Sequence, residues 1–347
     1  MILVTGGTGL VGSHLLYELA QHNTPIRAIS RRNINESKQI VEHVFSYYTA
    51  QVQQLSQRIE WLQGDVTDVE FLDIAMKGVE QIYHAAAVVS FDPADKHKIH
   101  VINVDGTANM VNLAIENKVS KFCHVSSIAV FSNQLANKVV DEELPIARRL
   151  ETGISMYAAS KYKSEIEVWR GINEGLNAVI VNPSIIFGPG KWDEGSGTMF
   201  RTIWNGLKFF TTGITGYVDV RDVVAIMVRL MESQIINKRF ILNSENCSYA
   251  DIFSSIAHHL GCKAPKYKAA AWMTGLAYRL DYLKHLLTGK KRLITKEISQ
   301  SAHRKTNYSN LKISQALNYS FIAIDDTIAH TARCFLLDLQ NTKNMVS

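Results

Sequence analysis

The sequence lacks several features that would place it in a specialised class of protein. Cysteine is scarce, and its four residues at positions 123, 247, 262 and 334 are scattered without metal-ligand spacing. This pattern argues against a disulfide framework and a metal site, and it favours structural thiols in a reduced, cytoplasmic compartment. No uncharged apolar run reaches the ~18 residues that cross a bilayer, so no transmembrane segment is expected. Internal repeats and low-complexity tracts are also absent.

Neither charge nor composition is extreme. Of the 347 residues, 46% are hydrophobic and 20% are charged, as is usual for a globular enzyme. The net charge of +5 suits an anionic cofactor but does not indicate nucleic acid, so we expect a small-molecule substrate. Met1 leads directly into the first predicted strand, and no signal peptide is expected.

The first sixteen residues, MILVTGGTGLVGSHLL, carry the most informative pattern. A short apolar run at 2–4 predicts a buried strand, and leucines at helical spacing after residue 13 predict a helix. Between them stand glycines at positions 6, 9 and 12. A strand, a glycine loop and a helix in this order predict a dinucleotide-binding turn rather than a glycine-rich turn without a ligand.

Each glycine of this loop has a separate physical role. Gly6 permits a tight turn, Gly9 lets a pyrophosphate approach the backbone, and Gly12 lets the helix pack close to the strand. The helix N-terminus then presents free N–H groups to the phosphates. The cofactor-binding residues predicted here are Gly6, Thr8, Gly9, Leu10, Val11 and Gly12.

The second predicted strand, 26–30, ends at Ser30, Arg31 and Arg32, with no acid before Glu36. An acid at this position accepts the ribose 2′-OH of NAD, whereas arginine accommodates the 2′-phosphate of NADP. The sequence therefore favours NADP(H), with NAD(H) as the alternative. A solvated basic turn is the other interpretation of the two arginines.

Two further strand ends add cofactor candidates. After the strand 58–62, Asp65 and the Val66 N–H are placed to read an adenine amino group, although a turn or helix-capping aspartate is the alternative. Near the C-terminal end of strand 81–89, Ala85, Ala86 and Ala87 leave room for a nicotinamide ribose. His84 is interpreted as a packed, hydrogen-bonded histidine rather than a base.

The catalytic candidates follow. Strand 121–125 is followed by Ser126 and Ser127, whose hydroxyls point toward the ligand crevice. Tyr157 and Lys161 share one face of a helix that continues to residue 169. A phenol with a reference pKa near 10 needs help at neutral pH, and we expect the lysine to lower it. Serine then holds a carbonyl oxygen while tyrosine exchanges its proton; the alternative is an ordinary helix tyrosine.

The rest of the chain suggests a two-part molecule. Strand 178–181 leads into a proline-glycine loop that could wall the nicotinamide pocket, and a strand from 216 with a helix capped near Asp222 is expected to return to the main domain. We predict an α/β, Rossmann-type doubly wound parallel sheet over 1–182 plus 217–245. A smaller substrate domain covers 183–216 plus 246–337, and 338–347 form a polar tail. An amphipathic helix at 269–287 is interpreted as packed, with a membrane-surface or lid role as the alternative.

Taken together, these residues resemble an extended short-chain dehydrogenase/reductase of the NAD-dependent epimerase/dehydratase superfamily. The matching motifs run in family order through residues 1–245: TGGTGLVG at 5–12, GDV at 64–66, HAAA at 84–87, NVDGT at 103–107, VSS at 125–127, YAASK at 157–161, NP at 182–183 and VDVRD at 218–222. The resemblance implies Tyr157 as acid/base, Lys161 on the ribose and tuning Tyr157, and Ser127 (less so Ser126) orienting the substrate. It also implies Asp65 and Val66 at the adenine, and the backbone of Pro183, Ser184, Ile185 and Ile186 at the nicotinamide.

Departures from the nucleotide-sugar enzymes refine the expectation. The chain reads VFS at 130–132 where they usually read Val-Tyr-Gly, and Asn182-Pro183 where they usually read Arg-Pro. These differences favour the dihydroflavonol reductase, cinnamoyl-CoA reductase and 3β-hydroxysteroid dehydrogenase branch. The expected function is NADP(H)-dependent interconversion of a carbonyl and an alcohol on a bulky, fairly apolar small molecule. Two alternatives are a nucleotide-sugar epimerase/dehydratase with tightly held NAD and a non-catalytic NADP sensor, against which the intact trio argues. A homodimer through helices 105–117 and 155–170 is a family-level expectation.

Overall fold

The computed structural model describes residues 1–131, 139–143, 155–270, 272–275, 278–279, 281 and 302–346. Ser132 and most of the predicted helix 269–287 therefore lie outside the described residues. No helix in the described part of the chain combines the length and apolarity needed to cross a bilayer.

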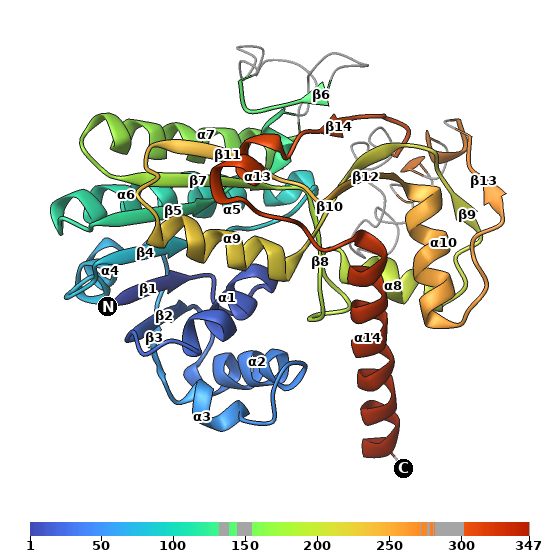
Figure 1. Ribbon diagram of the computed structural model, residues 1–347, viewed down its shortest axis with the longest axis horizontal. Helices are drawn as coiled ribbons and strands as arrows, with labels where there is room; N and C mark the ends of the chain where they lie inside the picture. Colours follow the sequence, from blue (N-terminus) through green and yellow to red (C-terminus); the bar gives the residue numbers. More distant parts are fainter. Residues whose placement is uncertain are drawn as a thin grey trace.

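A seven-stranded parallel sheet forms the centre of the molecule (Figure 1), in the order β11-β7-β5-β4-β1-β2-β3. The chain builds outward from β1 to β3 and then returns to place β4 on the other side of β1. In such folds ligands bind at the carboxyl ends of the strands beside this switch point. The predicted doubly wound α/β fold is confirmed. The strands are β1 (Ile2–Thr5), β2 (Ile26–Ser30), β3 (Ile59–Gln63), β4 (Gln81–His84), β5 (Lys121–Val125), β7 (Ala178–Pro183) and β11 (Lys238–Leu242).

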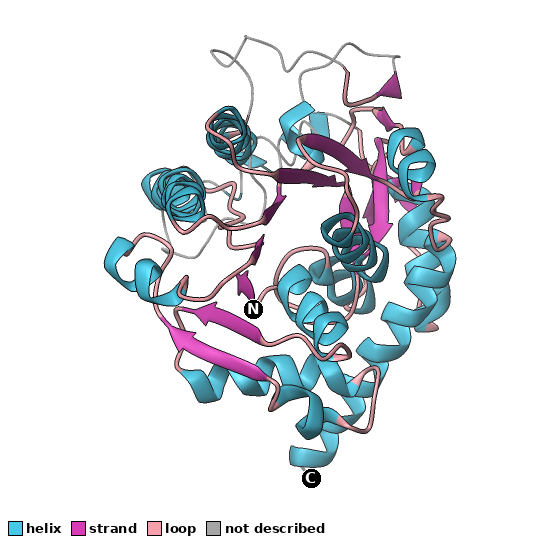
Figure 2. Cartoon of the chain, turned by 60° about the vertical axis from the view of Figure 1, so that its left-hand side comes forward, coloured by secondary structure: helices cyan, strands magenta, loops and turns pink. Residues whose placement is uncertain are grey.

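Helices cover both faces of this sheet (Figures 1 and 2), because the strands are apolar on both sides. On one face lie α1 (Leu10–Ala20), α2 (Ile34–Ser46), α3 (Val52–Ser56) and α9 (Val220–Glu232), whose core includes Leu16 and Met227. On the other lie α4 (Val69–Ala75), α6 (Gly106–Glu116) and α7 (Met156–Asn173), around Met110 and Val168. The spacing over 33–58 suggests one long helix, but the structure has two; Thr49 accepts a hydrogen bond from the Gln51 N–H in the turn between them.

Most of the remaining described elements build a second region beside the carboxyl ends of the central strands. Its core packs around Phe187, Phe200 and Phe335. The strands pair as three small sheets: β12 (Glu245–Ser248) with β10 (Ile214–Asp219) and β8 (Ile185–Phe187), β9 (Phe209–Phe210) with β13 (Tyr267–Lys268), and β6 (Val139–Val140) with β14 (Asn307–Tyr308). Its helices are α8 (Gly197–Trp204), α10 (Tyr249–Leu260) and α14 (Ile324–Val346), whereas α13 (Leu311–Leu317) packs on β11 and α9, and α5 (Lys96–His100) packs on α7.

Three sequence expectations need correction here. The strand near 216 belongs to the smaller sheet, because β10 pairs with β8 and β12, so the chain returns to the central sheet only at α9. That helix is capped by Asp219, which accepts the Arg221 N–H at 2.7 Å, and not by Asp222. Residues 338–346 are not a tail but the last turns of α14. Asp338 ties this helix to Tyr47 and Trp192 through hydrogen bonds of 2.5 and 2.7 Å.

Candidate active site

The predicted site residues meet where four central strands end. The glycine turn follows β1, Ala85 follows β4, Ser127 lies two residues beyond β5, and Pro183 ends β7. These four strands are neighbours in the sheet. Residues distant in sequence therefore share one edge, the edge that holds the ligand in doubly wound folds.

The glycine turn has the shape that a diphosphate requires. Gly6 has a φ of +72°, and a Cβ there would lie 2.7 Å from backbone atoms of Ala85 and Ala86. A Cβ on Gly12 would overlap the Gly6 carbonyl. Gly9 is the N-cap of α1, with no capping side chain and no acid in the first turn. The helix N-terminus is thus left open for an anion, and the turn fits a dinucleotide pyrophosphate.

Asp65, the predicted adenine-binding residue, lies in a local turn and also has one carboxylate oxygen near Arg31. One carboxylate oxygen accepts the Thr67 N–H and hydroxyl, each at 3.0 Å, in a local turn. The other lies 3.9 Å from the Arg31 guanidinium, which is about half exposed. Arg32 pairs with Glu36, and its N–H donates to the Ser30 hydroxyl at 3.1 Å. Arg31 therefore stands at the rim next to Asp65, whereas the charge of Arg32 is balanced by Glu36.

Ser127 and Tyr157 lie close together beyond the carboxyl end of β5. Their side chains share a hydrogen bond that lowers the pKa of the phenol. The Ala129 N–H donates to the Ser127 Oγ at 3.1 Å, and the Phe91 ring packs edge-on against Tyr157 at 5.7 Å. Burial outweighs the serine and raises the pKa of Tyr157 to about 12. The lowering expected from Lys161 is therefore not seen; Tyr157 is a protonated phenol at neutral pH in this structure.

The position of Lys161 explains why it does not lower the pKa of Tyr157. Its buried ammonium donates to the Val125 carbonyl at 2.8 Å, at the very end of β5. Burial lowers the pKa of Lys161 to about 8, and the neighbouring Glu165 acts in the opposite direction. The ammonium is thus fixed beside the strand end that carries Ser127 and retains most of its charge at neutral pH.

Glu165 is a residue of this site that the sequence analysis missed. It is fully buried, one helical turn beyond Lys161. It accepts a hydrogen bond from Asn182 Nδ2 at 2.5 Å, and Arg239 lies 3.8 Å away. Burial raises the pKa of Glu165, whereas Ser126 and Asn182 lower it. The i,i+4 spacing from Lys161 was the available signal. Because Ser126 is buried on the Glu165 side, Ser127 is the better placed of the two serines.

Two residues that the sequence analysis set aside have structural roles. His84 is buried between the Thr5 and Thr107 hydroxyls at 2.8 and 3.0 Å, and burial lowers its pKa to about 3, so it stays neutral. Asn103 donates to Val88 O and to the Ser160 hydroxyl, both at 3.0 Å. It thereby ties the segment after β4 to α7, which carries Tyr157.

The backbone of residues 183–186, which the resemblance places at the nicotinamide, is less available to a ligand than expected. Pro183 ends β7, but the Ser184 N–H already donates to Leu242 O at 2.9 Å. The Ser184 hydroxyl donates to the same carbonyl at 3.2 Å. Ile185 and Ile186 are half-buried in β8. Of these four residues, Ser184 is thus engaged within the protein, and its N–H is not available to a ligand.

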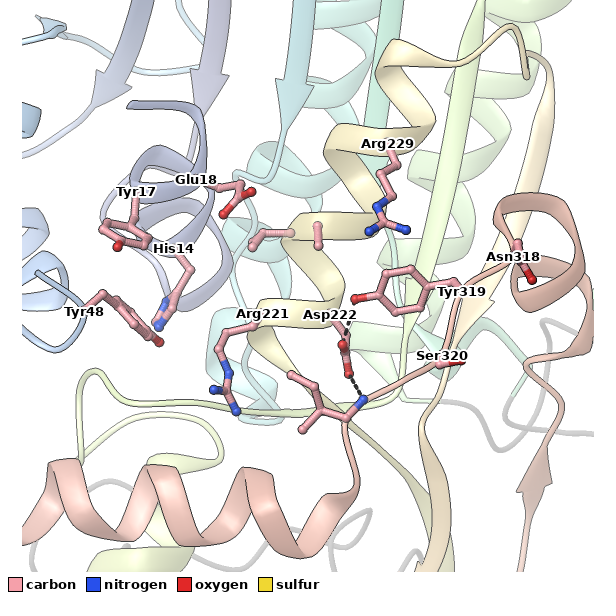
Figure 3. Close-up of a pocket in the computed structure, with 13 residues that line it drawn as sticks. His14, Tyr17, Glu18, Tyr48, Arg221, Asp222, Arg229, Asn318, Tyr319 and Ser320 are labelled. Carbon is pink, nitrogen blue, oxygen red and sulfur yellow. Dashed lines mark hydrogen bonds between the residues drawn. The ribbon is translucent and has the colours of Figure 1, made fainter. Parts of the chain in front are cut away.

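A separate pocket lies between α1, α9 and the segment 318–322 (Figure 3), with a volume of about 500 Å³. Asp222 closes one side by accepting hydrogen bonds from the Tyr319 hydroxyl at 2.8 Å and the Ile322 N–H at 3.0 Å. None of the predicted site residues lines this pocket. The candidate active site therefore lies at the carboxyl ends of the central strands and not in this pocket.

Comparison with known proteins places the chain in a family. Residues 2–242 match the family model described as the NAD dependent epimerase/dehydratase family. Among curated proteins, the chain is 29% identical to "Sterol demethylase protein B" of Methylococcus capsulatus over 76% of each chain. It is also 29% identical to a "Putative dihydroflavonol 4-reductase" of Synechocystis, over 78% of this chain and 75% of the relative.

Solved structures share the whole architecture. The structure titled "Crystal structure of gox2253" superposes with a TM-score of 0.79 at 25% identity, covering 97% of this chain and 98% of that one. "MoeE5 in complex with UDP-glucose and NAD" gives a TM-score of 0.73 at 17% identity, over 97% and 99% of the two chains. The second likeness, at this identity, shows the fold alone.

Proposed function

The chain belongs to the NAD dependent epimerase/dehydratase family and is an NAD(P)-dependent oxidoreductase of the extended short-chain dehydrogenase/reductase type, and we propose that it interconverts a carbonyl and an alcohol on a bulky, fairly apolar small molecule with NADP(H). The observation that carries the proposal is the Ser127–Tyr157 hydrogen bond at the switch point, with the Lys161 ammonium fixed at the end of β5.

The proposed mechanism assigns one task to each side chain. The nicotinamide, when bound, supplies or accepts the hydride. Ser127 holds the substrate oxygen with its hydroxyl, and Tyr157 donates its phenolic proton to that oxygen in the reductive direction. A phenol whose pKa is raised to about 12 is protonated at neutral pH and is suited to this donation. Lys161 holds the nicotinamide ribose and adds positive charge beside the reacting oxygen, while Phe91 covers Tyr157 and excludes water.

Two observations support the choice of cofactor and substrate. Arg31 stands half-exposed at the rim near Asp65, where a guanidinium can pair with a 2′-phosphate. The names of the curated relatives, a sterol demethylase protein and a dihydroflavonol reductase, refer to bulky, largely apolar ring compounds. Both features favour a reductase or alcohol dehydrogenase over a nucleotide-sugar enzyme.

The proposal is tested by NADPH and NADH consumption with a panel of ring-bearing ketones, aldehydes and alcohols. We expect tighter binding of NADPH than of NADH, and turnover of at least one such substrate. Tyr157→Phe should then lower kcat by about 10²–10⁴-fold and leave the NADPH Kd within a factor of two, because only the proton donor is lost.

Tyr162→Phe, on the same helix, is the matched control and should keep wild-type kcat. A Tyr157→Phe enzyme with wild-type kcat would rule out the mechanism. NAD retained through purification, with turnover of a UDP-sugar, would instead support the epimerase/dehydratase alternative. Tight NADPH binding without turnover of any panel member would favour the sensor.

A further inference from the structure

The second region carries an unusual surface at the β9–β13 pair. Phe209 and Tyr267 are directly paired across the two strands, with ring centroids 5.8 Å apart, yet they are 45% and 54% exposed. Paired aromatic rings ordinarily stabilise a sheet by burial. Here the pair faces solvent, at the edge of the molecule remote from β3 (Figure 1).

The exposed aromatic side chains of the described residues are all concentrated in this part of the chain. Besides the Phe209–Tyr267 pair they are Trp204 and Trp272, which are 40% and 71% exposed. The other large exposed apolar side chains, such as Ile74 and Leu311, are aliphatic and scattered over the rest of the molecule. Single exposed aliphatic residues are normal on a globular protein, but a grouping of aromatic ones is not.

In sequence, the stretches that carry these aromatic residues have charged side chains of one sign only. The stretches 195–218 and 252–280 contain no aspartate or glutamate, although the chain has 32. Exposed Lys208 and Lys266 precede the two strands, exposed Lys268 lies within β13, and exposed Lys263 comes three residues before Lys266. Their backbones are held together, since the Lys208 carbonyl accepts the N–H groups of Lys266 and Tyr267 at 3.1 and 3.0 Å. We call Lys208, Phe209, Lys266, Tyr267 and Lys268 the aromatic–lysine surface, and exposed Trp272 follows it in the chain.

We propose that the aromatic–lysine surface docks onto the headgroup region of an anionic lipid bilayer. Tryptophan, tyrosine and phenylalanine have an apolar body that enters the interface, and tyrosine and tryptophan keep a polar group at headgroup level. Lysines near an anionic membrane are each attracted by its surface potential. A second copy of this chain is a poor occupant, because a two-fold contact through the same surface would set like charges against each other.

The test is vesicle co-sedimentation of the full chain, which needs no turnover and so stands apart from the proposed function. We expect binding to vesicles that contain phosphatidylglycerol, weak binding to phosphatidylcholine alone, and loss of binding when salt rises from about 0.1 to 1 M. Lys266→Glu/Lys268→Glu should weaken binding about tenfold or more. Phe209→Ser/Tyr267→Ser should weaken binding to a comparable degree while leaving the thermal unfolding midpoint near that of the wild type, since the rings are already half exposed.

Matched controls come from exposed residues of the Rossmann domain. Lys77→Glu/Lys238→Glu carries the same charge change, and Ile74→Ser removes an apolar side chain that is 60% exposed. Both should bind vesicles as the wild type does. Equal losses in these controls would mean that net charge alone acts, and would overturn the proposal. The proposal would also be overturned if the wild type bound vesicles regardless of lipid charge, or if it did not bind them at about 0.1 M salt. Self-association of the chain that only the Phe209→Ser/Tyr267→Ser variant abolishes would overturn it as well.

Discussion

The cofactor half and the reaction half of the candidate active site depend on different parts of the chain, the backbone in the first and side chains in the second. On the cofactor half, the turn after β1 is shaped by backbone: Gly6 and Gly12 lie where a single added carbon would collide with main-chain atoms. On the reaction half, the interactions are made by side chains, because Ser127 acts on Tyr157 and the buried carboxylate of Glu165 acts on Lys161. Steric constraints set the shape of the cofactor half, whereas burial and hydrogen bonding set the protonation of the side chains in the reaction half.

The difference determines how each half fails. A backbone turn tolerates almost no added volume but is insensitive to pH. The polar network tolerates isosteric replacement but depends on charges whose pKa values burial has moved. Substitutions in the two halves should therefore give distinguishable signatures, volume-dependent on one side and pH-dependent on the other.

Gly12→Ala should have the largest effect on the cofactor half. Its Cβ would overlap the Gly6 carbonyl, so the turn and α1 must move apart. We expect NADPH affinity to fall about 100-fold or more, and stability to fall by about 1–3 kcal/mol, the usual cost of overpacking. Fluorescence titration and thermal unfolding measure the two.

Gly190→Ala is the control, because its Cβ would meet only the Leu10 side chain at 3.4 Å. A Gly12→Ala protein that binds NADPH as tightly as the control does would show that the turn is not sterically limited.

Glu165→Gln should have the next largest effect, and it should show as a pH shift. A lysine ammonium is present below its pKa and lost as pH rises through it, here about 8. Without the carboxylate, which raises that pKa, the ammonium is lost at lower pH, and the alkaline limb of kcat/KM should move down by about one pH unit. The amide keeps the shape of the carboxyl group beside Asn182.

Glu167→Gln on the same helix, whose partner is the partly exposed Arg170, should leave the pH profile in place. An unchanged limb in Glu165→Gln would mean that this carboxylate does not act on Lys161.

The features that the sequence could predict divide in the same way, into those set by local sequence patterns and those set by burial and distant partners. The glycine turn, the doubly wound fold class and the Tyr157–Lys161 helix were predictable because motifs and local spacing encode them. The direction of the Tyr157 pKa shift was not, since the sequence does not show how deeply the phenol is buried or that Lys161 donates to the Val125 carbonyl. For the same reason Glu165 was missed, because its partners come from β7 and β11.

Pairings over long sequence separations explain the other errors. β10 looked like part of the central sheet because a strand records its own pattern and not its neighbours. Residues 338–346 looked like a tail because their polar composition does not reveal that Asp338 is a hydrogen-bonding centre for Tyr47 and Trp192. The homodimer, the cytoplasmic location and the NADP preference stay predictions.

Arg31→Ala should have a smaller effect, confined to the choice of cofactor. Removing a half-exposed guanidinium from the rim should lower the preference for NADPH over NADH about tenfold, and NADH affinity should barely change. Arg32→Ala is the comparison, since Glu36 already neutralises Arg32. Equal losses of NADPH and NADH affinity in Arg31→Ala would assign this arginine to the turn rather than to the 2′-phosphate.

Gly9→Ala should have the smallest effect, and it separates the two uses of glycine within the turn. Its φ of −86° is open to any residue, and its Cβ would lie 3.3 Å from the Gly6 carbonyl, so a small adjustment suffices. Stability should change by less than about 1 kcal/mol. If a diphosphate approaches this backbone, the added methyl group stands in its path, and NADPH affinity should fall about fivefold even though the fold is intact. Titration and thermal unfolding of the same sample decide this, because unchanged affinity at unchanged stability would place the phosphates elsewhere along α1.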